Sequence, residues 1–574
     1  MTRMTDRRRY LLIGLAVFLV GVAMRTLPLH WTSLPYNVDG YHFAALARKA
    51  GAAGHLAAAG RFLNPDEYVF AAYLTGVSQA TGAGPLAVSQ FLVAVIGTVP
   101  ALVVVSVVRR VCARRDWKPS HTRIAATLAG LALAAEGVYL GRSAAVSSEM
   151  LGHALVLVTV IAFYRALRTE RPAWMALTLV SVAFLPFTHN LGAMVAALAL
   201  LAVFVRSLRR PTTRRVAFGI VVLVGFWTFT VAYYQFTGLA EASYVSSLPG
   251  LFLAWLVFLV AFVSLLPSVG TTVQRLVPAG LIVGVVTLLV ANHFLPIFPG
   301  TAGTDALQLA LLLPIAGIGL LAAWGLPRAS DAGGPAVVVG SLLAAPLVLI
   351  GFALTGSLTH EYESLAVRSQ IFTHFSMCAL ASLAVVDVGV RRTSKTAVRT
   401  AVRRLAVPLL ALCVVASVPV AFAGLHATSA QPTVTPSEFA TATFASNEID
   451  GGWVGDGHVV ILSTNYYPGR ADARYTPLYG WLHGNGPPPN CPVVAQRSWT
   501  TVGAQLFPSS PTAVTTRRYD RWVARRNVVY SAHGRDPLVI TTPRGSGTCS
   551  VDTGRGPAAG LSATGSGRGN VTRR

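Results

Sequence analysis

The sequence predicts a polytopic α-helical membrane protein that carries a soluble C-terminal domain. Of its 574 residues, 53% are hydrophobic and 12% are charged, and the mean hydropathy is +0.57. Apolar runs long enough to cross a hydrocarbon core of ~30 Å recur along most of the chain. The loops between these runs alternate between arginine-rich and acidic. Together these observations exclude a soluble globular enzyme, a disordered chain and a disulfide-rich secreted module.

Thirteen apolar runs predict about thirteen transmembrane helices. They lie at about residues 10–28, 84–107, 124–141, 148–164, 173–187, 190–205, 216–236, 250–268, 276–295, 305–325, 335–355, 369–388 and 405–425. Proline and glycine interrupt several runs, which transmembrane helices tolerate. The runs at 173–187 and 190–205 are short, so this part of the chain forms either two spans or one broken helix.

The net charge of +24 is distributed unevenly over the loops, and this distribution predicts the orientation of the chain in the membrane. If the N-terminus lies inside, as Arg7-Arg8-Arg9 suggests, every second connection is cytoplasmic, and these connections carry most of the arginines and few acids. Cytoplasmic loops are usually positive, so the N-terminus is expected inside and the C-terminal domain outside. We therefore expect a multi-pass protein of the cell (plasma) membrane. The positive charge faces anionic lipid headgroups of the bilayer, and no nucleic-acid partner is expected.

The chain is expected to have three parts. Residues 1–425 form the transmembrane domain, with a long first external loop at 29–83 that contains two helical stretches, 41–58 and 66–81. Residues 426–552 form an external α/β or mostly β domain, with strands expected at 458–463 and 537–541. Residues 553–574 are rich in Gly, Ser and Arg and are expected to be disordered. Cys491 and Cys549 both lie in the external domain, where oxidation is permitted, so we expect a disulfide between them.

Ionisable residues gather at the external ends of the spans. Because such residues are costly near a membrane, they are candidates for function. For any one of them, a solvated loop position is an equally good interpretation, but the set favours one external cavity. Its members are Asp39, Arg142, Glu149, His189, Glu361, Glu363 and Arg368.

The first external loop carries a motif that resembles a known family. The segment Asn37-Val38-Asp39-Gly40-Tyr41-His42-Phe43-Ala44, followed by Ala47-Arg48, resembles the first-loop motif of the catalytic subunit of archaeal and bacterial oligosaccharyltransferases. These enzymes belong to the GT-C superfamily of polyprenyl-phosphate-dependent glycosyltransferases. From spacing alone, Asp39 could cap a helix, bind a metal ion or act as a catalytic base. The resemblance implies that Asp39 binds a divalent metal and the acceptor.

Further segments extend the resemblance to other external loops. Arg142-Ser143-Ala144-Ala145-Val146-Ser147-Ser148-Glu149 is similar to a family motif with an arginine and two acids, although Ser147 holds the place of the first acid. His360-Glu361-Tyr362-Glu363 with Arg368 looks like a late family loop, and which glutamate matches is open. Thr188-His189-Asn190-Leu191-Gly192 is similar to a histidine-containing turn.

The resemblance implies a role for each of these residues. Asp39 and Glu149 would be the metal ligands, with Mg²⁺ or Mn²⁺ as the cofactor. Asp39, Glu149 and Glu361 or Glu363 would form the catalytic group. Arg142, Arg368, His189, Tyr41 and His42 would bind the substrate and its phosphate.

The function implied is transfer of a sugar or glycan from a polyprenyl-phosphate carrier to an acceptor on the external face. The family's Trp-Trp-Asp-Tyr-Gly motif is absent, because Ser463-Thr464-Asn465-Tyr466-Tyr467-Pro468-Gly469 stands near its expected place. Sequon-directed protein N-glycosylation is therefore not expected, and the acceptor is a glycan, a lipid or a protein. The alternatives are a secondary transporter, for which His153, His374 and Asp387 are the nearest mid-membrane candidates, and a non-catalytic relative.

Overall fold

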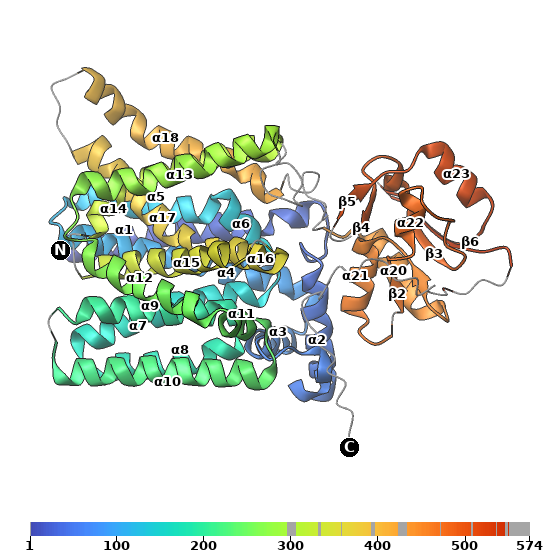
Figure 1. Cartoon of the computed structure of the whole chain (residues 1–574), viewed down its shortest axis with the longest axis horizontal. Helices are drawn as coiled ribbons and strands as arrows, with labels where there is room; N and C mark the ends of the chain where they lie inside the picture. The colour runs from blue at the N-terminus through green and yellow to red at the C-terminus, as the bar shows by residue number, and fades with distance from the viewer. Residues whose placement is uncertain are drawn as a thin grey trace.

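The computed structural model consists of a long helical part and a smaller α/β unit at one end of it (Figure 1). It describes residues 2–209, 211–295, 306–330, 334–357, 359–391, 397–422, 433–470, 472–506, 509–534, 536–545 and 549. The predicted disordered tail, 553–574, lies outside the described residues. The N-terminus lies at the end of the helical part that is remote from the C-terminal unit (Figure 1), as an odd number of membrane crossings requires.

The helical part runs from α1 to α18. Its apolar helices are α1 (Thr2–Thr26), α4 (Pro85–Arg114), α5 (Pro119–Ala135), α6 (Gly137–Ala144), α7 (Ser148–Thr169), α8 (Pro172–Phe184), α9 (Asn190–Ser207), α10 (Thr213–Thr237), α12 (Pro249–Leu265), α13 (Thr271–Phe294), α14 (Ala306–Ser330), α15 (Ala336–Gly356), α17 (Thr373–Val386) and α18 (Ala397–Phe422). Four further helices lie in the connections: α2 (Asp39–Ala53), α3 (Tyr68–Thr81), α11 (Ala240–Ser247) and α16 (His360–Gln370).

Each of the thirteen predicted apolar runs corresponds to a helix or a bent pair of helices. Within the described residues, ten helical segments are long and apolar enough to cross a membrane, and α5 with α6, bent by 56°, passes the same test as a pair. The other two runs are the shorter apolar helices α8 and α12. The chain is therefore a multi-pass helical membrane protein, as predicted.

The segment 173–205 forms two helices. Pro186 and the 3-10 turn Leu185–Phe187 end α8, and His189 begins α9 by accepting a hydrogen bond from the backbone N–H of Gly192 at its Nδ1 atom. Both helices pack on α7. Of the two predictions for this segment, two helices is therefore confirmed, and one broken helix is wrong.

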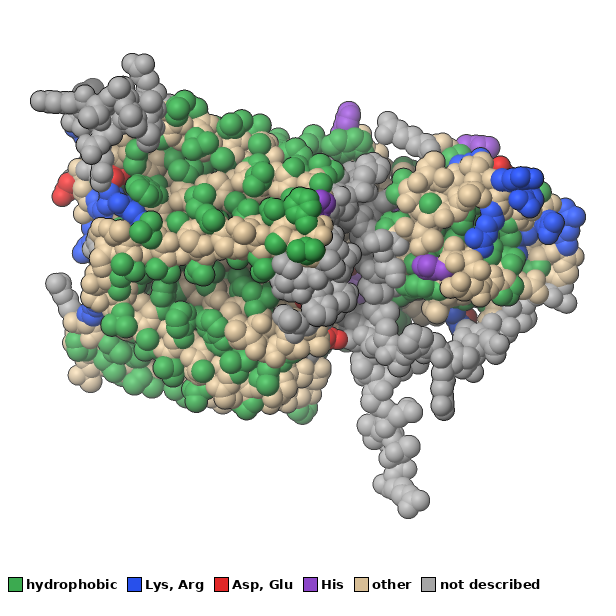
Figure 2. Space-filling model, turned by 45° about the horizontal axis from the view of Figure 1, so that its top comes forward, with side chains coloured by type: hydrophobic (Ala, Val, Ile, Leu, Met, Phe, Trp, Pro, Cys, Tyr) green, Lys and Arg blue, Asp and Glu red, His purple; other side chains and the backbone are tan. Residues whose placement is uncertain are grey.

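Small residues let the central helices approach one another closely. A Cβ atom on Gly325 of α14 would lie 2.1 Å from the backbone oxygen of Leu380 in α17, so the two backbones are in direct contact. Close backbone approach of this kind stabilises helix pairs in lipid, where apolar burial alone drives little association. On the face drawn in Figure 2, hydrophobic side chains cover the outside of the helical part, whereas Lys and Arg gather at its remote end and on the C-terminal unit.

The C-terminal unit is an α/β fold, one of the two predicted forms. Its main sheet has the strand order β2-β1-β3-β7-β6, in which β1 runs parallel to β2 and β3 and the other pairs are antiparallel. The strands are β1 (Trp453–Val454), β2 (Ala473–Arg474), β3 (Val493–Gln496), β6 (Asn527–Ala532) and β7 (Leu538–Thr542), and β4 (Ala504–Leu506) pairs with β5 (Ser509–Thr512) in a second sheet. The helices are α20 (Pro436–Glu448), α21 (Gly457–Tyr466), α22 (Leu478–Leu482) and α23 (Thr516–Ala524).

One of the two predicted strands is wrong. The strand expected at 537–541 is β7, but residues 458–463 lie within α21. The carboxylate of Asp456 accepts a hydrogen bond from the backbone N–H of Val459 and caps this helix. Such a cap contributes ~1 kcal/mol. The β-branched residues of this segment favour a strand, yet with this cap the segment is helical.

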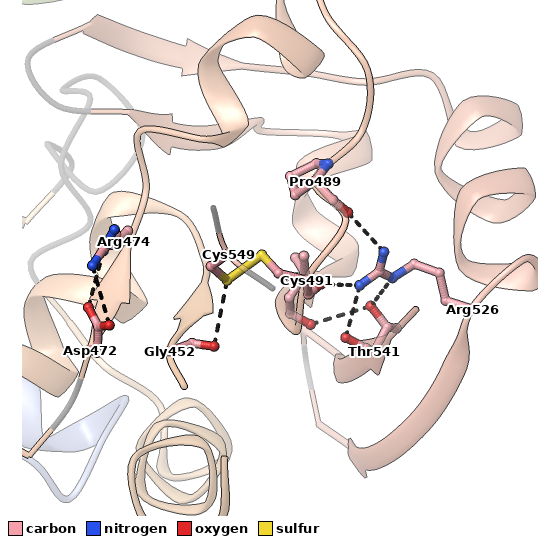
Figure 3. The surroundings of a disulfide bond; sticks show 9 residues. Gly452, Asp472, Arg474, Pro489, Cys491, Arg526, Thr541 and Cys549 are labelled. Atoms are coloured by element: carbon pink, nitrogen blue, oxygen red, sulfur yellow. Dashed lines mark hydrogen bonds and ion pairs between the residues drawn. A yellow bond between two sulfur atoms is a disulfide. The ribbon is translucent and has the colours of Figure 1, made fainter. Parts of the chain in front are cut away.

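A disulfide joins Cys491 to Cys549 across 58 residues (Figure 3). Beside it, the Arg526 guanidinium donates hydrogen bonds to the backbone oxygens of Pro489, at 2.9 Å, and of Cys491. The Cys549 sulfur lies 3.6 Å from the backbone oxygen of Gly452. These contacts tie the end of the described chain to the main sheet.

Helix α2 joins the C-terminal unit to the helical part. The Arg48 guanidinium donates to the backbone oxygen of Tyr466 at 3.0 Å and lies over its ring. The Asn465 amide donates to the backbone oxygen of Val38 at 3.1 Å. The C-terminal unit therefore contacts the start of α2, next to Asp39.

Candidate active site

The turn before α2 brings two of the sequence motifs together. The Asn37 side-chain oxygen accepts a hydrogen bond from the backbone N–H of Val146 at 2.8 Å, and its amide donates to the Asp39 carboxylate at 3.2 Å. A Cβ atom on Gly40 would lie only 3.1 Å from the Val146 Cβ. Because Val146 stands between Arg142 and Glu149, the first loop and the second motif form one surface.

Asp39 is the first residue of α2, and it does not cap that helix. Val38 holds the N-cap position, and no side chain caps the helix there. The Asp39 carboxylate is thus left to face solvent. The capping interpretation of Asp39 is therefore not what the structure contains.

The pKa of Asp39 is raised above its usual value. Asp39 is accessible to solvent, yet the protein groups around it reduce its hydration, and this is the largest cause. The positive charges of His42 and Arg142 lower the pKa, and the negative charges of Glu67 and Glu149 raise it. Four charged groups from three separate segments thus act on one carboxylate.

Glu149 lies in the first turn of α7 and is buried, with 7% of its surface exposed. Its Oε1 atom has no hydrogen-bond partner among the described residues. A buried carboxylate oxygen without a partner is costly. This atom is therefore available to a cation or a hydrogen-bond donor from a substrate.

Glu67 is a site residue that the sequence analysis did not single out. Its carboxylate lies 3.2 Å from the Nε2 atom of His42 and accepts a hydrogen bond from the backbone N–H of Asn64 at 3.3 Å. The available signal was the acidic pair Asp66-Glu67 in the same external loop as Asp39. The pair His42 and Glu67 forms one wall beside Asp39.

A second group surrounds His189. Its Nε2 atom lies 3.3 Å from a guanidinium nitrogen of Arg368, which is carried by α16. A Cβ atom on Gly152 would lie 2.5 Å from the His189 Cβ, so α7 packs directly on this histidine. Arg142 and Arg368 are both close enough to His189 for electrostatic interaction. Because Arg142 also acts on Asp39, it connects the two groups.

The remaining predicted residues lie elsewhere. Glu361 and Glu363 are exposed in the first turn of α16, and their catalytic role stays a prediction. The Tyr41 ring is fully buried between α2 and the C-terminal unit, stacked on Phe439 and in edge contact with Tyr466. The role of Tyr41 in substrate binding stays a prediction that this packing does not support.

Within the described residues, no group of three His, Cys, Asp or Glu side chains gathers to hold a metal ion. The donor set around Asp39 and Glu149 is a pair of carboxylates, with an open oxygen on Glu149. Mg²⁺ is commonly held by one or two carboxylates, while substrate phosphates and water complete its shell. Asp39 and Glu149 interact electrostatically and supply the residue types for that manner of binding, and their role as metal ligands stays a prediction.

The chain is similar to several solved structures. No protein-family model and no curated protein matches it. The apo oligosaccharyltransferase of Archaeoglobus fulgidus matches with 13% identity and a TM-score of 0.48, over 86% of this chain and 70% of that one. The oligosaccharyltransferase AglB of the same organism, in complex with an inhibitory peptide and a dolichol-phosphate, matches with 14% identity and a TM-score of 0.47, over 81% of this chain and 64% of that one.

A third similar structure is ArnT from Cupriavidus metallidurans bound to undecaprenyl phosphate. It has 16% identity and a TM-score of 0.37, over 92% of this chain and 97% of that chain.

Proposed function

We propose that the chain is a membrane glycosyltransferase that moves a sugar or glycan from a polyprenyl-phosphate carrier to an acceptor on the external face. The observation that carries the proposal is the meeting of Asp39 and Glu149 with Arg142, held by the hydrogen bond between Asn37 and Val146. This site lies at the end of the helical part that faces the C-terminal unit.

The two arginines bind the donor phosphate. Arg368 lies 3.3 Å from His189, and Arg142 interacts with the same histidine electrostatically. A guanidinium suits phosphate oxygens through two parallel hydrogen bonds. The polyprenyl chain of the carrier stays in the hydrocarbon region. In this proposal, the sugar lies between the arginines and the two carboxylates.

Asp39 accepts the proton of the acceptor. The acceptor atom forms a bond to the anomeric carbon, the bond between that carbon and the phosphate oxygen breaks, and the electron pair leaves with the lipid phosphate. His42 and Glu67 hold the wall beside Asp39. Asp39 and Glu149 would hold a divalent cation, Mg²⁺ or Mn²⁺, whose positive charge would stabilise the leaving phosphate.

The acceptor is proposed to be something other than a sequon peptide. The segment at the expected place of the Trp-rich motif, which includes Asn465 and Tyr466, contacts α2 instead of presenting two tryptophans. A glycan, a lipid or another protein segment can approach Asp39 from solvent.

The alternative, a secondary transporter, is less well supported. Two of its three mid-membrane candidates are held in pairs: His374 lies 2.7 Å from the Glu136 carboxylate, and Asp387 pairs with Arg328. The third, His153, is buried and packs against the rings of Tyr139 and Phe372. Glu136 also caps α6 by accepting two backbone N–H hydrogen bonds. Carboxylates held in this way serve structure, whereas the Glu149 oxygen is open.

The proposal is tested by transfer from a defined lipid-linked sugar with the purified full chain in lipid nanodiscs. We expect Asp39→Asn and Glu149→Gln each to lower the transfer rate at least ~100-fold. Arg142→Gln with Arg368→Gln should abolish binding of polyprenyl phosphate, which Glu149→Gln should retain. Asp472→Asn, an exposed carboxylate of the C-terminal unit, is the matched control.

Two results would overturn the proposal. One is transfer at the wild-type rate by both carboxylate variants. The other is wild-type protein that neither binds polyprenyl phosphate nor transfers sugar from any carrier in a panel of polyprenyl-linked donors, which would indicate a non-catalytic relative.

A further inference from the structure

An open groove runs between α1 and α4 at the end of the helical part that is remote from the C-terminal unit. Its volume is about 440 Å³. From α1 it is lined by Tyr10, Gly14 and Leu15, and from α4 by Val105, Ser106 and Arg109, among others. The groove has an apolar stretch and a single arginine at its end. It lies far along the bundle from Asp39 and has no role in the proposed transfer.

Gly14 opens the groove to the membrane. Nothing lies within 4 Å of the position that a Cβ atom on Gly14 would take. On the same helix, Leu11, Leu15 and Leu19 are exposed by 64%, 53% and 57%. In a chain whose apolar helices cross a bilayer, this exposed surface contacts hydrocarbon. The apolar stretch of the groove is therefore suited to an acyl chain.

Arg109 provides a positive charge at the polar end. Its guanidinium lies over the Tyr10 ring, 4.0 Å from the ring centre, which fixes its position at the mouth of the groove. The nearby carboxylate, Asp6, is already paired with Arg123 at 3.1 Å. In the part of the chain that the structure describes, no carboxylate pairs with Arg109, and its side chain is exposed.

We propose that this groove is a binding site for an anionic glycerophospholipid. One acyl chain lies along Gly14 and Val105, and the phosphate accepts hydrogen bonds from Arg109. Basic positions at the ends of transmembrane helices attract anionic headgroups, and a guanidinium suits phosphate. A free phosphate ion would satisfy Arg109 alone, whereas a lipid also fills the apolar stretch.

The test uses the purified full chain in nanodiscs made of phosphatidylcholine with a minority of phosphatidylglycerol. Lipid that stays bound after detergent extraction is identified by native mass spectrometry. We expect retained phosphatidylglycerol to exceed retained phosphatidylcholine, and Arg109→Gln to lower this preference about fivefold. Gly14→Leu fills the groove and should reduce the retention of both lipids. Arg110→Gln, an exposed neighbour that does not line the groove, is the matched control.

Each other outcome has a definite meaning. An equal loss of preference in Arg109→Gln and Arg110→Gln would overturn the site in favour of diffuse surface charge. Full retention of lipid in Gly14→Leu would overturn the acyl-chain position. Displacement of phosphatidylglycerol by millimolar inorganic phosphate would show that the phosphate alone binds and would also overturn the lipid site. Thermal melting of each variant in the same nanodiscs identifies any that fail to fold.

Discussion

The apolar helices fall into a packed group and a lipid-facing group, and the candidate site belongs to the packed one. In α7, α9 and the segment Glu361–Gly389, 72%, 78% and 83% of the most apolar stretch is buried inside the protein. In α10 the share is 28%, and in α13 it is 6%. Glu149, His189 and Arg368 all come from the packed group or from its ends.

The difference teaches where sequence changes matter in this protein. Lipid tails are as apolar as leucine side chains, so exposing an apolar helix face to the membrane costs little. The packed helices instead hold polar groups in fixed positions by close contact. Geometry at the site should therefore be sensitive to small changes in α7, and far less so to changes in α13.

The largest expected effect comes from a glycine of the packed group. Gly152→Val would place side-chain atoms where the His189 Cβ now lies, 2.5 Å from a Cβ at position 152. α7 and the start of α9 must then separate, which moves His189 away from Arg142. A shift of about 1 Å in a bound substrate can cost ~100-fold in rate, so we expect at least that loss of transfer. Transfer assays and thermal melting in nanodiscs measure it.

The matched variant lies in the lipid-facing group. Gly284→Val in α13 meets nothing within 4 Å of the new Cβ and should change the transfer rate less than about twofold. Equal losses of transfer in the two variants would show that the packed helices are no more sensitive to substitution than the lipid-facing helices.

The positions of the helices were predictable because the runs are long and apolar. Thirteen runs gave helices at the expected places, and the odd number agrees with the opposite positions of the N-terminus and the C-terminal unit. The helix α21 was not predictable from strand propensity, because the cap at Asp456 and the packing of the unit outweigh the β-branched run. The local sequence pattern identifies that a segment forms an element, but contacts with distant residues decide whether that element is a helix or a strand.

The site was predictable only in part, for the same reason. The motifs pointed to Asp39 and Glu149, which the fold brings onto one surface. The bond that joins their loops, from Val146 to Asn37, spans 109 residues and has no local signal. The contact of Glu67 with His42 likewise depends on how the first external loop folds back. The sequence did not predict the partner of His374, because Glu136 lies on a span far away along the chain.

A smaller effect is expected from the residue that joins the two loops. Asn37→Ala removes the hydrogen bonds to Val146 and Asp39, each worth ~1 kcal/mol. We expect kcat/KM for transfer to fall roughly tenfold while the melting temperature changes little. The reason is that Asp39 loses its orientation, although it remains at the start of α2.

The control for this variant is Gln79, a second amide side chain, which makes one long hydrogen bond at the protein surface. Gln79→Ala removes only the exposed contact to the Gly51 oxygen at 3.4 Å, so transfer should stay at the wild-type rate. If Asn37→Ala also transferred at the wild-type rate, the two loops would have to be held by something other than this asparagine.

The smallest expected effects are shifts in the pH dependence of transfer, and their direction follows from the charges around Asp39. Asp39 accepts a proton only when it is ionised, and its raised pKa means that activity falls, as the pH decreases, sooner than an ordinary aspartate would allow. Glu67→Gln removes a negative charge that raises this pKa. The acid limb, which is the low-pH side of the profile of transfer rate against pH, should therefore move to lower pH. His42→Gln removes a charge that lowers it, so the limb should move to higher pH.

Because the two variants should shift the pH dependence in opposite directions, the comparison separates a charge effect on Asp39 from a loss of packing. Loss of packing alone would lower the rate at every pH and would leave the acid limb in place. Glu448→Gln, an exposed carboxylate at the end of α20, should leave both the rate and the limb unchanged. Shifts of Glu67→Gln and His42→Gln in the same direction would mean that the titrating group is not Asp39. The proton would then have to be accepted by another residue, and Glu149, which interacts with Asp39 electrostatically, would be tested next.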